Sequence, residues 1–480
     1  MNKKRLLLSI CQILSLTPLI FITACGKKKK TKITTKTNTT TTEHVHEFGE
    51  FKTYASPTCT EEGFRKATCS CGEVLTEIIP KIDHTYVDDK CSVCGHERLT
   101  DGFNIYYSDI DEYYHIDNYT GTSTTVRIPY LYDDGENGDH KIYIDKTSVD
   151  GAFVSKLKEC NIKKIILGKG YETVPENMFL GLDNLEEVVF NKDVRRIMDN
   201  AFYDCPKLKT VGFNEEIEYI GFYSFAYCAL ESFASPYNLE TIEDGAFAYN
   251  VNMTTVTLGN NVEVLGDNAF SGTKITSIKI PYSLKEFGGH EDLSYLTTIT
   301  VDPRNAIFEF TNGCLINKSE NKLIKALNVI EIDSTIKYIE SYAFEGLDFT
   351  DLTNFVIPSS VEYIGFRAFK NAIFNDLTIS NGVVYIAEEA FAGITFTSPT
   401  TITLTIPDSV NIIEYHAFLE AEFNKIVIPS SVVKLGDEVF KDCLITTIDI
   451  NMYTLDSPDC SSDWDSGIDL DVTTINIITD

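Results

Sequence analysis

One apolar template recurs ten times between residues 171 and 440, and it constrains the fold more than any other feature of the chain. In each copy an apolar or tyrosine residue is followed by two residues, a second apolar residue, four residues and a phenylalanine. Within each of two blocks the phenylalanines are 22 to 27 residues apart: Phe179, Phe202, Phe225, Phe247 and Phe270, then Phe344, Phe369, Phe391, Phe418 and Phe440. A fixed period of this length predicts stacked structural repeats.

A second pattern follows the phenylalanines and predicts a short strand in each repeat. Leu208-x-x-Val211-x-Phe213 and Phe423-x-x-Ile426-x-Ile428 end in the alternation of a strand with one buried face. One repeat cannot bury its own apolar side, whereas stacked repeats form a continuous core. We therefore predict that the repeat phenylalanines fill this core and do not form an exposed aromatic stripe. Alanine precedes seven of the ten, which allows close packing.

Three cysteines occupy one place in the repeat, three residues after the phenylalanine. Cys205, Cys228 and Cys443 are therefore predicted to be small buried residues that close a coil, with no redox function.

The stretch FVIPSSVEYIGFRAF, residues 355–369, resembles the BspA-like leucine-rich repeats of bacterial surface proteins. The resemblance covers roughly residues 150–450. It implies a β-rich curved solenoid with coils of 22–27 residues over residues 151–450. It also implies adhesion or binding of host or partner proteins, and it supplies no catalytic residues.

Three segments depart from the repeat. Residues 271–335 lack the phenylalanine and predict an inserted strand pair that turns at Asn312-Gly313. Residues 101–150 are rich in tyrosine and predict an amino-terminal cap, after which 151–153 would open a degenerate first coil. Residues 451–480 predict an acidic closing cap. Their spaced carboxylates leave a calcium site as the alternative, with Asp463, Asp465, Asp469 and Asp471 as its ligands.

The amino terminus predicts export. Lys3, Lys4 and Arg5 precede an apolar stretch over residues 6–22, and Cys25 follows small residues. Residues 1–25 resemble a bacterial lipoprotein signal, which implies lipidation at Cys25 and attachment to the outer face of the cell membrane. The alternative is an uncleaved membrane anchor, although the apolar stretch is barely long enough to span a bilayer. Residues 26–43 are dominated by Lys and Thr and predict a solvated tether.

Residues 44–100 predict a small Cys/His module that is similar to a zinc ribbon. The expected zinc ligands are Cys69, Cys71, Cys91 and Cys94, with His46 and His84 as alternates. Exported proteins also form disulfides, but Cys59 makes the number of cysteines here odd. Similar modules recur in bacterial surface proteins, which supports a spacer or docking module. We expect at most one structural zinc and no organic cofactor.

Charge narrows the kinds of partner. The net charge of −30 excludes a phosphate-binding surface, so no nucleic-acid partner is expected. The leading hypothesis is a surface lipoprotein that binds a protein or another envelope or matrix macromolecule and is not an enzyme. The alternatives are an envelope hydrolase that uses the Cys/His site and a passive spacer. No binding residues can be named, although one set of outward strand positions varies freely: Gly212, Thr257, Lys279, Val356, Thr378, Thr405, Val427 and Asp449.

Overall fold

The computed structural model separates into two compact units, Met1–Arg98 and Leu99–Asp480, which are described one at a time. The structure describes residues 30–31, 46–58, 61–70, 72–82, 86–87, 90–91, 102–109, 113–128, 131–133, 139–143, 152–289, 293–329, 331–468 and 473–479.

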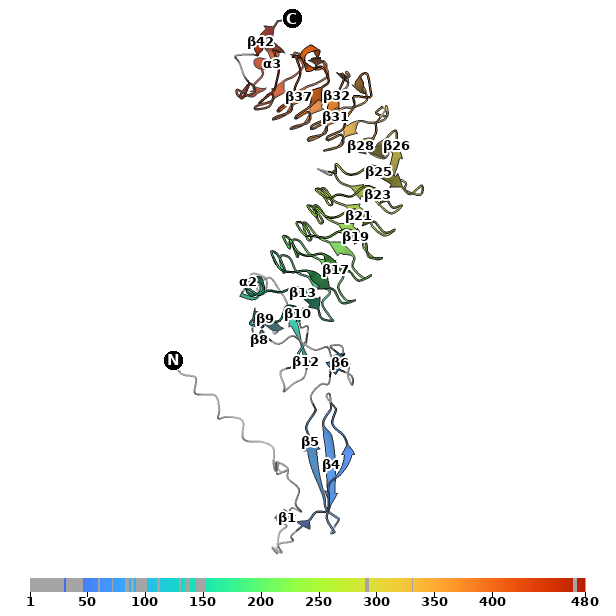
Figure 1. Ribbon diagram of the computed structural model, residues 1–480, viewed down its shortest axis with the longest axis vertical. Helices are drawn as coiled ribbons and strands as arrows, with labels where there is room; N and C mark the ends of the chain where they lie inside the picture. Colours follow the sequence, from blue (N-terminus) through green and yellow to red (C-terminus); the bar gives the residue numbers. More distant parts are fainter. Residues whose placement is uncertain are drawn as a thin grey trace, which may run out of the picture. The chain divides into compact units, whose positions relative to one another are not determined.

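The first unit is built on a three-stranded antiparallel sheet (Figure 1). Its strands are β3 (Lys52–Ala55), β4 (Gly63–Thr68) and β5 (Val74–Ile79). Two short antiparallel pairs accompany it: β1 (Lys30–Thr31) with β2 (His46–Glu47), and β6 (Tyr86–Val87) with β7 (Lys90–Cys91).

The second unit begins with a four-stranded sheet in the order β11-β12-β9-β8. These strands are β8 (Phe103–Ser108), β9 (Tyr113–Tyr119), β11 (Leu131–Asp133) and β12 (Asp139–Tyr143). Helix α2 (Ala152–Glu159) follows and packs against β9. In the described part of 151–153, Ala152 and Phe153 open this helix, where the later coils have turns, and the chain continues into a strand of the solenoid at Lys164–Leu167.

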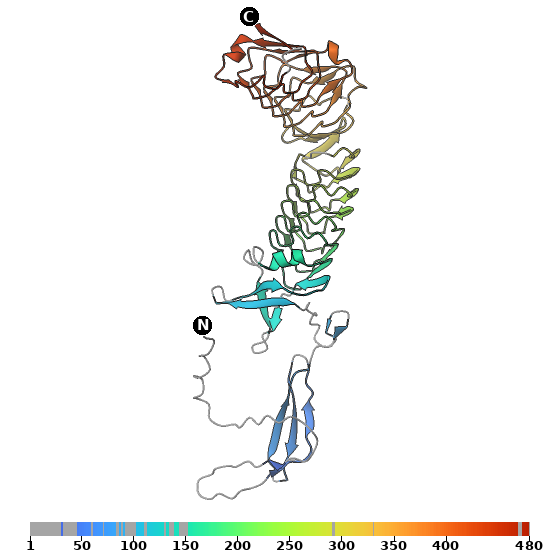
Figure 2. The ribbon, with the colours of Figure 1, turned by 60° about the vertical axis from the view of Figure 1, so that its left-hand side comes forward.

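The rest of the second unit is a solenoid in which each coil adds one strand to each of two parallel ladders (Figures 1 and 2). The first ladder has longer strands and breaks into several sheets. Its members are β10 (Thr125–Ile128), β13 (Lys164–Leu167), β15 (Glu187–Val189), β17 (Thr210–Gly212), β19 (Ser232–Ala234), β21 (Thr255–Thr257), β23 (Ser277–Ile280), β25 (Thr298–Val301), β30 (Phe355–Ile357), β33 (Leu377–Ile379), β36 (Thr403–Thr405), β38 (Lys425–Ile428), β40 (Thr447–Asn451) and β42 (Thr474–Ile478).

The second ladder has strands of two residues and falls into two sheets, the first of which ends at β24. Its members are β14 (Thr173–Val174), β16 (Arg196–Ile197), β18 (Tyr219–Ile220), β20 (Thr241–Ile242), β22 (Val264–Leu265), β24 (Glu286–Phe287), β29 (Tyr338–Ile339), β31 (Tyr363–Ile364), β34 (Tyr385–Ile386), β37 (Ile412–Ile413), β39 (Lys434–Leu435) and β41 (Asp459–Cys460). A minor pair, β32 (Ile373–Phe374) with β35 (Thr395–Phe396), and the 3-10 turn η1 (Pro399–Thr401) complete the coils.

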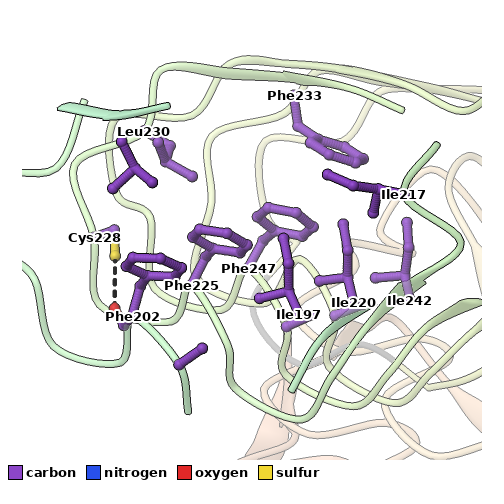
Figure 3. Close-up of a cluster of buried hydrophobic side chains, with 14 of the residues drawn as sticks. Ile197, Phe202, Ile217, Ile220, Phe225, Cys228, Leu230, Phe233, Ile242 and Phe247 are labelled. Atoms are coloured by element: carbon purple, nitrogen blue, oxygen red, sulfur yellow. Dashed lines mark hydrogen bonds between the residues drawn. The ribbon is translucent and has the colours of Figure 1, made fainter. Parts of the chain in front are cut away.

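The repeat phenylalanines are buried and stack from coil to coil, as predicted (Figure 3). Consecutive ring centroids are 4.6 to 5.6 Å apart within each block. The backbone follows the same register, since the Phe179 N–H donates to the Ala201 carbonyl at 2.8 Å and the Phe202 N–H to the Ser224 carbonyl at 2.8 Å. The small residue that precedes most of the phenylalanines therefore lets the next coil approach closely.

The cysteines that follow the phenylalanines are buried, which confirms the structural prediction. The Cys228 thiol donates to the Phe202 carbonyl of the preceding coil at 3.2 Å (Figure 3), and the Cys205 thiol donates to the Phe179 carbonyl at 3.2 Å. Asn250 occupies the same place in its coil and donates to the Phe225 carbonyl at 2.8 Å. The position thus needs a small buried donor, which a thiol or an amide can supply.

The predicted strand pair interrupts the phenylalanine stack. β26 (Phe308–Thr311) and β27 (Cys314–Asn317) are antiparallel, and Asn312-Gly313 turns between them with φ of 49° and 78°. β28 (Lys322–Ala326) then rejoins the second ladder through β29. The coils themselves continue through the first part of the segment expected to be irregular, up to Val301, because β23, β24 and β25 keep their parallel partners.

The last residues extend both ladders and close the core. β41 pairs with β39, and β42 pairs with β40, while α3 (Met452–Leu455) follows β40. The Trp464 ring is 7% exposed and meets Phe440 edge-on, with ring centroids 6.2 Å apart. A bulky aromatic side chain thereby covers the end of the phenylalanine stack.

Candidate interaction surface

The Cys/His module has one expected ligand whose side chain the structure describes. Cys69 is buried at the end of β4, in a turn where the Gly72 N–H donates to the Cys69 carbonyl at 2.9 Å and Gly72 has a φ of 95°. This is the type of turn expected of a zinc knuckle. His46 and Cys91 are placed by their backbone in β2 and β7, whereas Cys71, Cys94, His84, Cys25 and Cys59 lie outside the described residues.

The described residues contain no assembled metal site. Among these residues no three His, Cys, Asp or Glu side chains lie close enough to hold a metal ion. Asp463 and Asp465 of the calcium alternative belong to the described residues, but Asp469 and Asp471 do not. Zinc and calcium therefore stay predictions from the sequence.

The outward positions of the longer strands form a polar surface. Gly212, Thr257, Lys279, Val356, Thr378 and Thr405 are exposed, while Val427 and Asp449 are half-buried. Asp449 forms an ion pair with Lys425 and accepts a hydrogen bond from Asn476 at 2.8 Å. This surface holds few aromatic side chains, so it lacks the residues that usually dominate protein contacts.

Aromatic side chains gather instead on the turns beside the buried phenylalanines. We call this cluster the tyrosine patch: Tyr203, Phe222, Tyr223, Tyr227 and Tyr249. Tyr227 and Tyr249 stack with ring centroids 4.7 Å apart, and Tyr203 meets Tyr227 edge-on at 5.4 Å. Tyr223 and Tyr227 are 41% and 42% exposed. Three neighbouring coils thus present a contiguous set of rings to solvent.

The backbone under the tyrosine patch is unusual for aromatic residues. Tyr223, Tyr227 and Tyr249 have φ of 50°, 58° and 58°, in the left-handed region that disfavours bulky side chains. Nearby coils fill the equivalent positions with residues that tolerate this conformation: Asn177, Asn200, Gly245 and Asn268 before the phenylalanine, and Gly181, Asp204 and Gly272 after it. The fold therefore needs the left-handed backbone at these positions but not the tyrosines.

Glycines of the following coils make room for two of the rings. A Cβ atom on Gly245 would lie 2.3 Å from Cε1 of Tyr223, and one on Gly272 would lie 2.6 Å from Cδ1 of Tyr249. Both glycines also have positive φ, of 62° and 69°. Each tyrosine ring thus occupies the space that a side chain at the glycine of the next coil would need.

Carboxylates lie on the same coils as the tyrosine patch. Three residues before the phenylalanine, successive coils carry Asp199, Phe222, Asp244 and Asp267, so Phe222 takes the place of an aspartate in an acidic row. The Asp199 carboxylate accepts from the Phe222 N–H at 3.1 Å. Burial raises the pKa of the Tyr227 hydroxyl, and the neighbouring Tyr203, Tyr223 and Asp204 raise it further. The patch is therefore a negative environment.

Sequence reasoning missed the tyrosine patch because it treated the repeat as a core pattern and its outward strands as the variable surface. The signal was available. Tyrosine recurs two residues before or after two consecutive repeat phenylalanines, Phe225 and Phe247, at positions 223, 227 and 249. The left-handed backbone also had a signal, because Asn or Gly recurs at the equivalent positions of other coils, as at Asn200, Gly245 and Asn268.

The repeats of the solenoid match a family of known proteins. Six copies of a family model, BspA type leucine rich repeat region, match the chain and together span residues 152–458. No curated protein matches the chain. No helix of the described part is both long enough and apolar enough to cross a lipid bilayer.

Three solved structures are similar to the chain. A leucine rich cell surface protein from Faecalibacterium prausnitzii is 23% identical, with 76% of this chain and 97% of that chain covered and a TM-score of 0.61. The pneumococcal vaccine antigen PcpA is 17% identical over 80% and 98% of the two chains, with a TM-score of 0.49. A leucine-rich repeat protein from Bacteroides ovatus is 17% identical over 79% and 99%, with a TM-score of 0.46. The first of these shows a shared fold.

Proposed function

The chain belongs to the BspA-type leucine-rich repeat family, and from this premise we propose that it is a cell-surface protein that binds another protein through the tyrosine patch. Stacked repeats present extended surfaces suited to macromolecules, since every coil adds one more set of outward side chains. A surface that binds a partner should differ in amino-acid composition from the solvent-exposed surface of the other coils.

The tyrosine patch is the observation that carries the proposal. Tyrosine combines a large apolar ring with a hydroxyl group, and it dominates the energetic centres of protein interfaces. Here Tyr223, Tyr227 and Tyr249 occupy positions whose left-handed backbone disfavours bulky side chains. The same left-handed backbone occurs at these positions in the other coils, where Arg367, Glu389 and His416 adopt it, so the patch is distinguished by its clustered, exposed tyrosines.

Partner capture by the full chain tests the proposal. The immobilised protein is exposed to soluble extracellular-matrix proteins and to envelope extracts, and specific partners are identified by mass spectrometry. Tyr223→Ala/Tyr227→Ala should reduce the affinity for such a partner at least about tenfold, the loss expected for centrally placed aromatic side chains. Tyr237→Ala is the control, because Tyr237 is 71% exposed and lies outside the patch.

Two results would contradict the proposal. Equal capture by the double variant and the unchanged protein would place the contact elsewhere on the solenoid. Capture of no specific partner by any form would favour the passive spacer.

We further propose that Cys25 carries a lipid that attaches the protein to the outer face of the cell membrane. The support is the charged, apolar and small-residue order of residues 1–25. Metabolic labelling with a fatty acid tests this, since Cys25→Ser should abolish the label and release the protein into the medium. A labelled Cys25→Ser protein would contradict it.

For the Cys/His module we propose a structural zinc held by Cys69, Cys71, Cys91 and Cys94, with His46 or His84 as alternates. The buried Cys69 in its glycine turn supports this proposal. Elemental analysis of the purified protein should give about one zinc per chain, and Cys69→Ser should lose it. Intact mass after alkylation would instead reveal disulfides as cysteines that resist labelling until they are reduced.

A further inference from the structure

Next to the tyrosine patch, a tyrosine ring of the solenoid already contacts a cationic side chain. In the same coils the Arg196 guanidinium lies over the Tyr219 ring, with Cζ 4.4 Å from the ring centroid. Burial raises the pKa of the Tyr219 hydroxyl to about 12, helped by the carboxylates of Glu243 and Asp199, while Arg196 opposes the shift. A tyrosine ring among carboxylates is therefore a place where a guanidinium is already bound within the chain.

The tyrosine patch offers the same combination on the next face of the coil. Tyr223 and Tyr227 present their rings, and Asp204 contributes its charge to the environment of Tyr227. In the described part of the chain no Lys or Arg side chain lies over the ring of Tyr223 or Tyr227. The difference from Tyr219 is that no cation of the chain itself occupies these two rings.

Carboxylates lie on the coils to either side of the exposed rings. Phe222 stands between Asp199 and Asp244 in the acidic row, and adjacent coils are separated by the strand spacing of about 4.8 Å. Asp199 and Asp244 are fixed, because each accepts a backbone N–H of the following coil, from Phe222 at 3.1 Å and from Asp267 at 2.8 Å. A side chain placed on the rings would thus meet carboxylates held in position.

Charge decides which partner fits these rings. The whole chain carries 71 acidic and 41 basic residues, so an anionic partner would meet repulsion over a long distance. An apolar segment would bury the rings but would leave the surrounding carboxylates desolvated without a counterion. A basic segment satisfies both, since cations are attracted to the faces of tyrosine rings and to carboxylates.

From this geometry we infer that the tyrosine patch binds a basic segment of a partner protein. An Arg or Lys side chain of the partner lies on Tyr223 and Tyr227, within reach of the carboxylates of Asp204 and Asp199. The inference rests on the proposed function, because it names the chemistry of the partner for the same patch.

Binding of defined peptides to the full chain tests the inference. The probes are fluorescent peptides of four Gly-Arg repeats, four Gly-Lys repeats and four Gly-citrulline repeats, in which citrulline keeps the planar shape of arginine without its charge. Affinities are measured at about 150 mM salt, where long-range attraction is screened. The protein variants are Tyr223→Leu/Tyr227→Leu and Tyr223→Phe/Tyr227→Phe, neither of which alters the net charge. Tyr237→Leu is the matched control.

The arginine peptide should bind the unchanged protein and the Phe variant within about threefold of each other, because phenylalanine keeps the ring face. The Leu variant should bind it about tenfold more weakly, while the Tyr237→Leu protein should bind normally. The lysine peptide should show the same pattern across the protein variants as the arginine peptide. The citrulline peptide should bind the unchanged protein at least about tenfold more weakly than the arginine peptide. Circular dichroism and backbone hydrogen exchange of the Leu variant check that its coils stay folded.

Two outcomes would overturn the inference. Equal affinity of the Leu variant and the unchanged protein for the arginine peptide would mean that only the general acidic field attracts it. Equal binding of the citrulline peptide would mean that the rings take a planar or apolar group without regard to charge. In either case a partner whose capture still depends on Tyr223 and Tyr227 would leave the proposed function standing, so the two failures are distinguishable.

Discussion

At the level of single residues, the left-handed positions on either side of each repeat phenylalanine decide what the coil can display. A glycine there removes backbone strain and opens space for a neighbouring ring, as Gly245 does for Tyr223. A bulky residue accepts strain of roughly 1–2 kcal/mol because the ladder hydrogen bonds on both sides fix the backbone. The surface of the solenoid is thus built from pairs of residues on successive coils.

Gly245→Ala should therefore do more than strain the backbone. The added methyl group would lie 2.3 Å from Cε1 of Tyr223, so the ring must move. We expect a stability loss of roughly 1–2 kcal/mol from the positive φ, with a further loss from displacement of the ring. Urea unfolding followed by circular dichroism measures the change.

Gly346→Ala is the matched control, because Gly346 has a φ of 68° and no atom lies within 4 Å of the added Cβ. It should show the backbone cost alone. Combining Gly245→Ala with Tyr223→Ala should remove the extra loss and make the two glycine sites equivalent. A Gly245→Ala protein no less stable than Gly346→Ala would contradict the proposed fit of ring and glycine.

The buried cysteines give a second prediction for single residues. Burial raises the pKa of the Cys443 thiol to about 12, helped by Asp442 and Glu420 and opposed by a backbone hydrogen bond at Ala421, so the thiolate is absent near pH 8. The thiol also donates to the Phe418 carbonyl at 2.7 Å. We expect iodoacetamide to label Cys443 in denaturant but not in the folded protein at pH 8, as measured by peptide mass spectrometry.

Half-buried Cys160 serves as the internal comparison within the same digest. It should label measurably before Cys443 in the folded protein. Rapid labelling of Cys443 in folded protein would show that the coil opens there or that the thiol is more acidic than its surroundings imply.

At the level of elements, the phenylalanine stack holds the coils together. Phe225 is fully buried and stacks on Phe202 and Phe247 at 5.1 and 5.5 Å. Phe225→Ala should cost about 3–5 kcal/mol, since the stack on both sides prevents the cavity from collapsing. Hydrogen exchange of the amides between residues 197 and 250 should accelerate by roughly a hundredfold or more.

Phe222→Ala is the control in the same coil, because the Phe222 side chain is 38% exposed. It should change stability by less than about 0.5 kcal/mol. Comparable acceleration of exchange by the two substitutions would mean that the stack does not carry the stability of the coil.

The repeat predicted the elements well because its spacing reflects burial, which is the strongest term in folding. The stacked phenylalanines, the thiols behind them and the hairpin at Asn312-Gly313 all follow from residue type and spacing. Helix α2 was missed because its eight residues, AFVSKLKE, resemble the start of a coil in composition. The tyrosine patch was missed because its position depends on backbone conformation and on neighbouring coils, which no single repeat reveals.

At the level of the whole molecule, carboxylates act in two opposite ways. Some face cations, as Glu389 faces Arg367, with Oε2 and Oε1 accepting from Nε and Nη2 at 2.8 and 2.9 Å. Others face one another along the ladders, as Glu243 faces Asp244, Asp199 and Glu286. Acidic residues exceed basic residues by 30, so some carboxylates have no cation to face. Repulsion between these carboxylates lowers the stability of the folded chain at neutral pH.

Glu243→Gln should therefore stabilise the protein at pH 7. Burial raises the pKa of Glu243, and the neighbouring carboxylates raise it further, although a hydrogen bond from Tyr219 works against them. A raised folded-state pKa means that ionised Glu243 destabilises the fold, and this effect disappears as the pH falls below the ordinary value of 4.5. Urea midpoints measured from about pH 7 to pH 4 should thus converge for the two proteins.

Glu389→Gln should show the opposite sign. Burial raises the pKa of Glu389, but hydrogen bonding and charge from Arg367 and Lys370 outweigh it, so the pKa is lowered overall. Its contribution is present at neutral pH and is lost only as the pH falls through the lowered value. Glu389→Gln should therefore destabilise the protein at pH 7, with a gap that narrows in acid. If both substitutions shifted the midpoint in the same direction at pH 7, local pairing would not govern these carboxylates, and the net charge alone would set the response of the solenoid to pH.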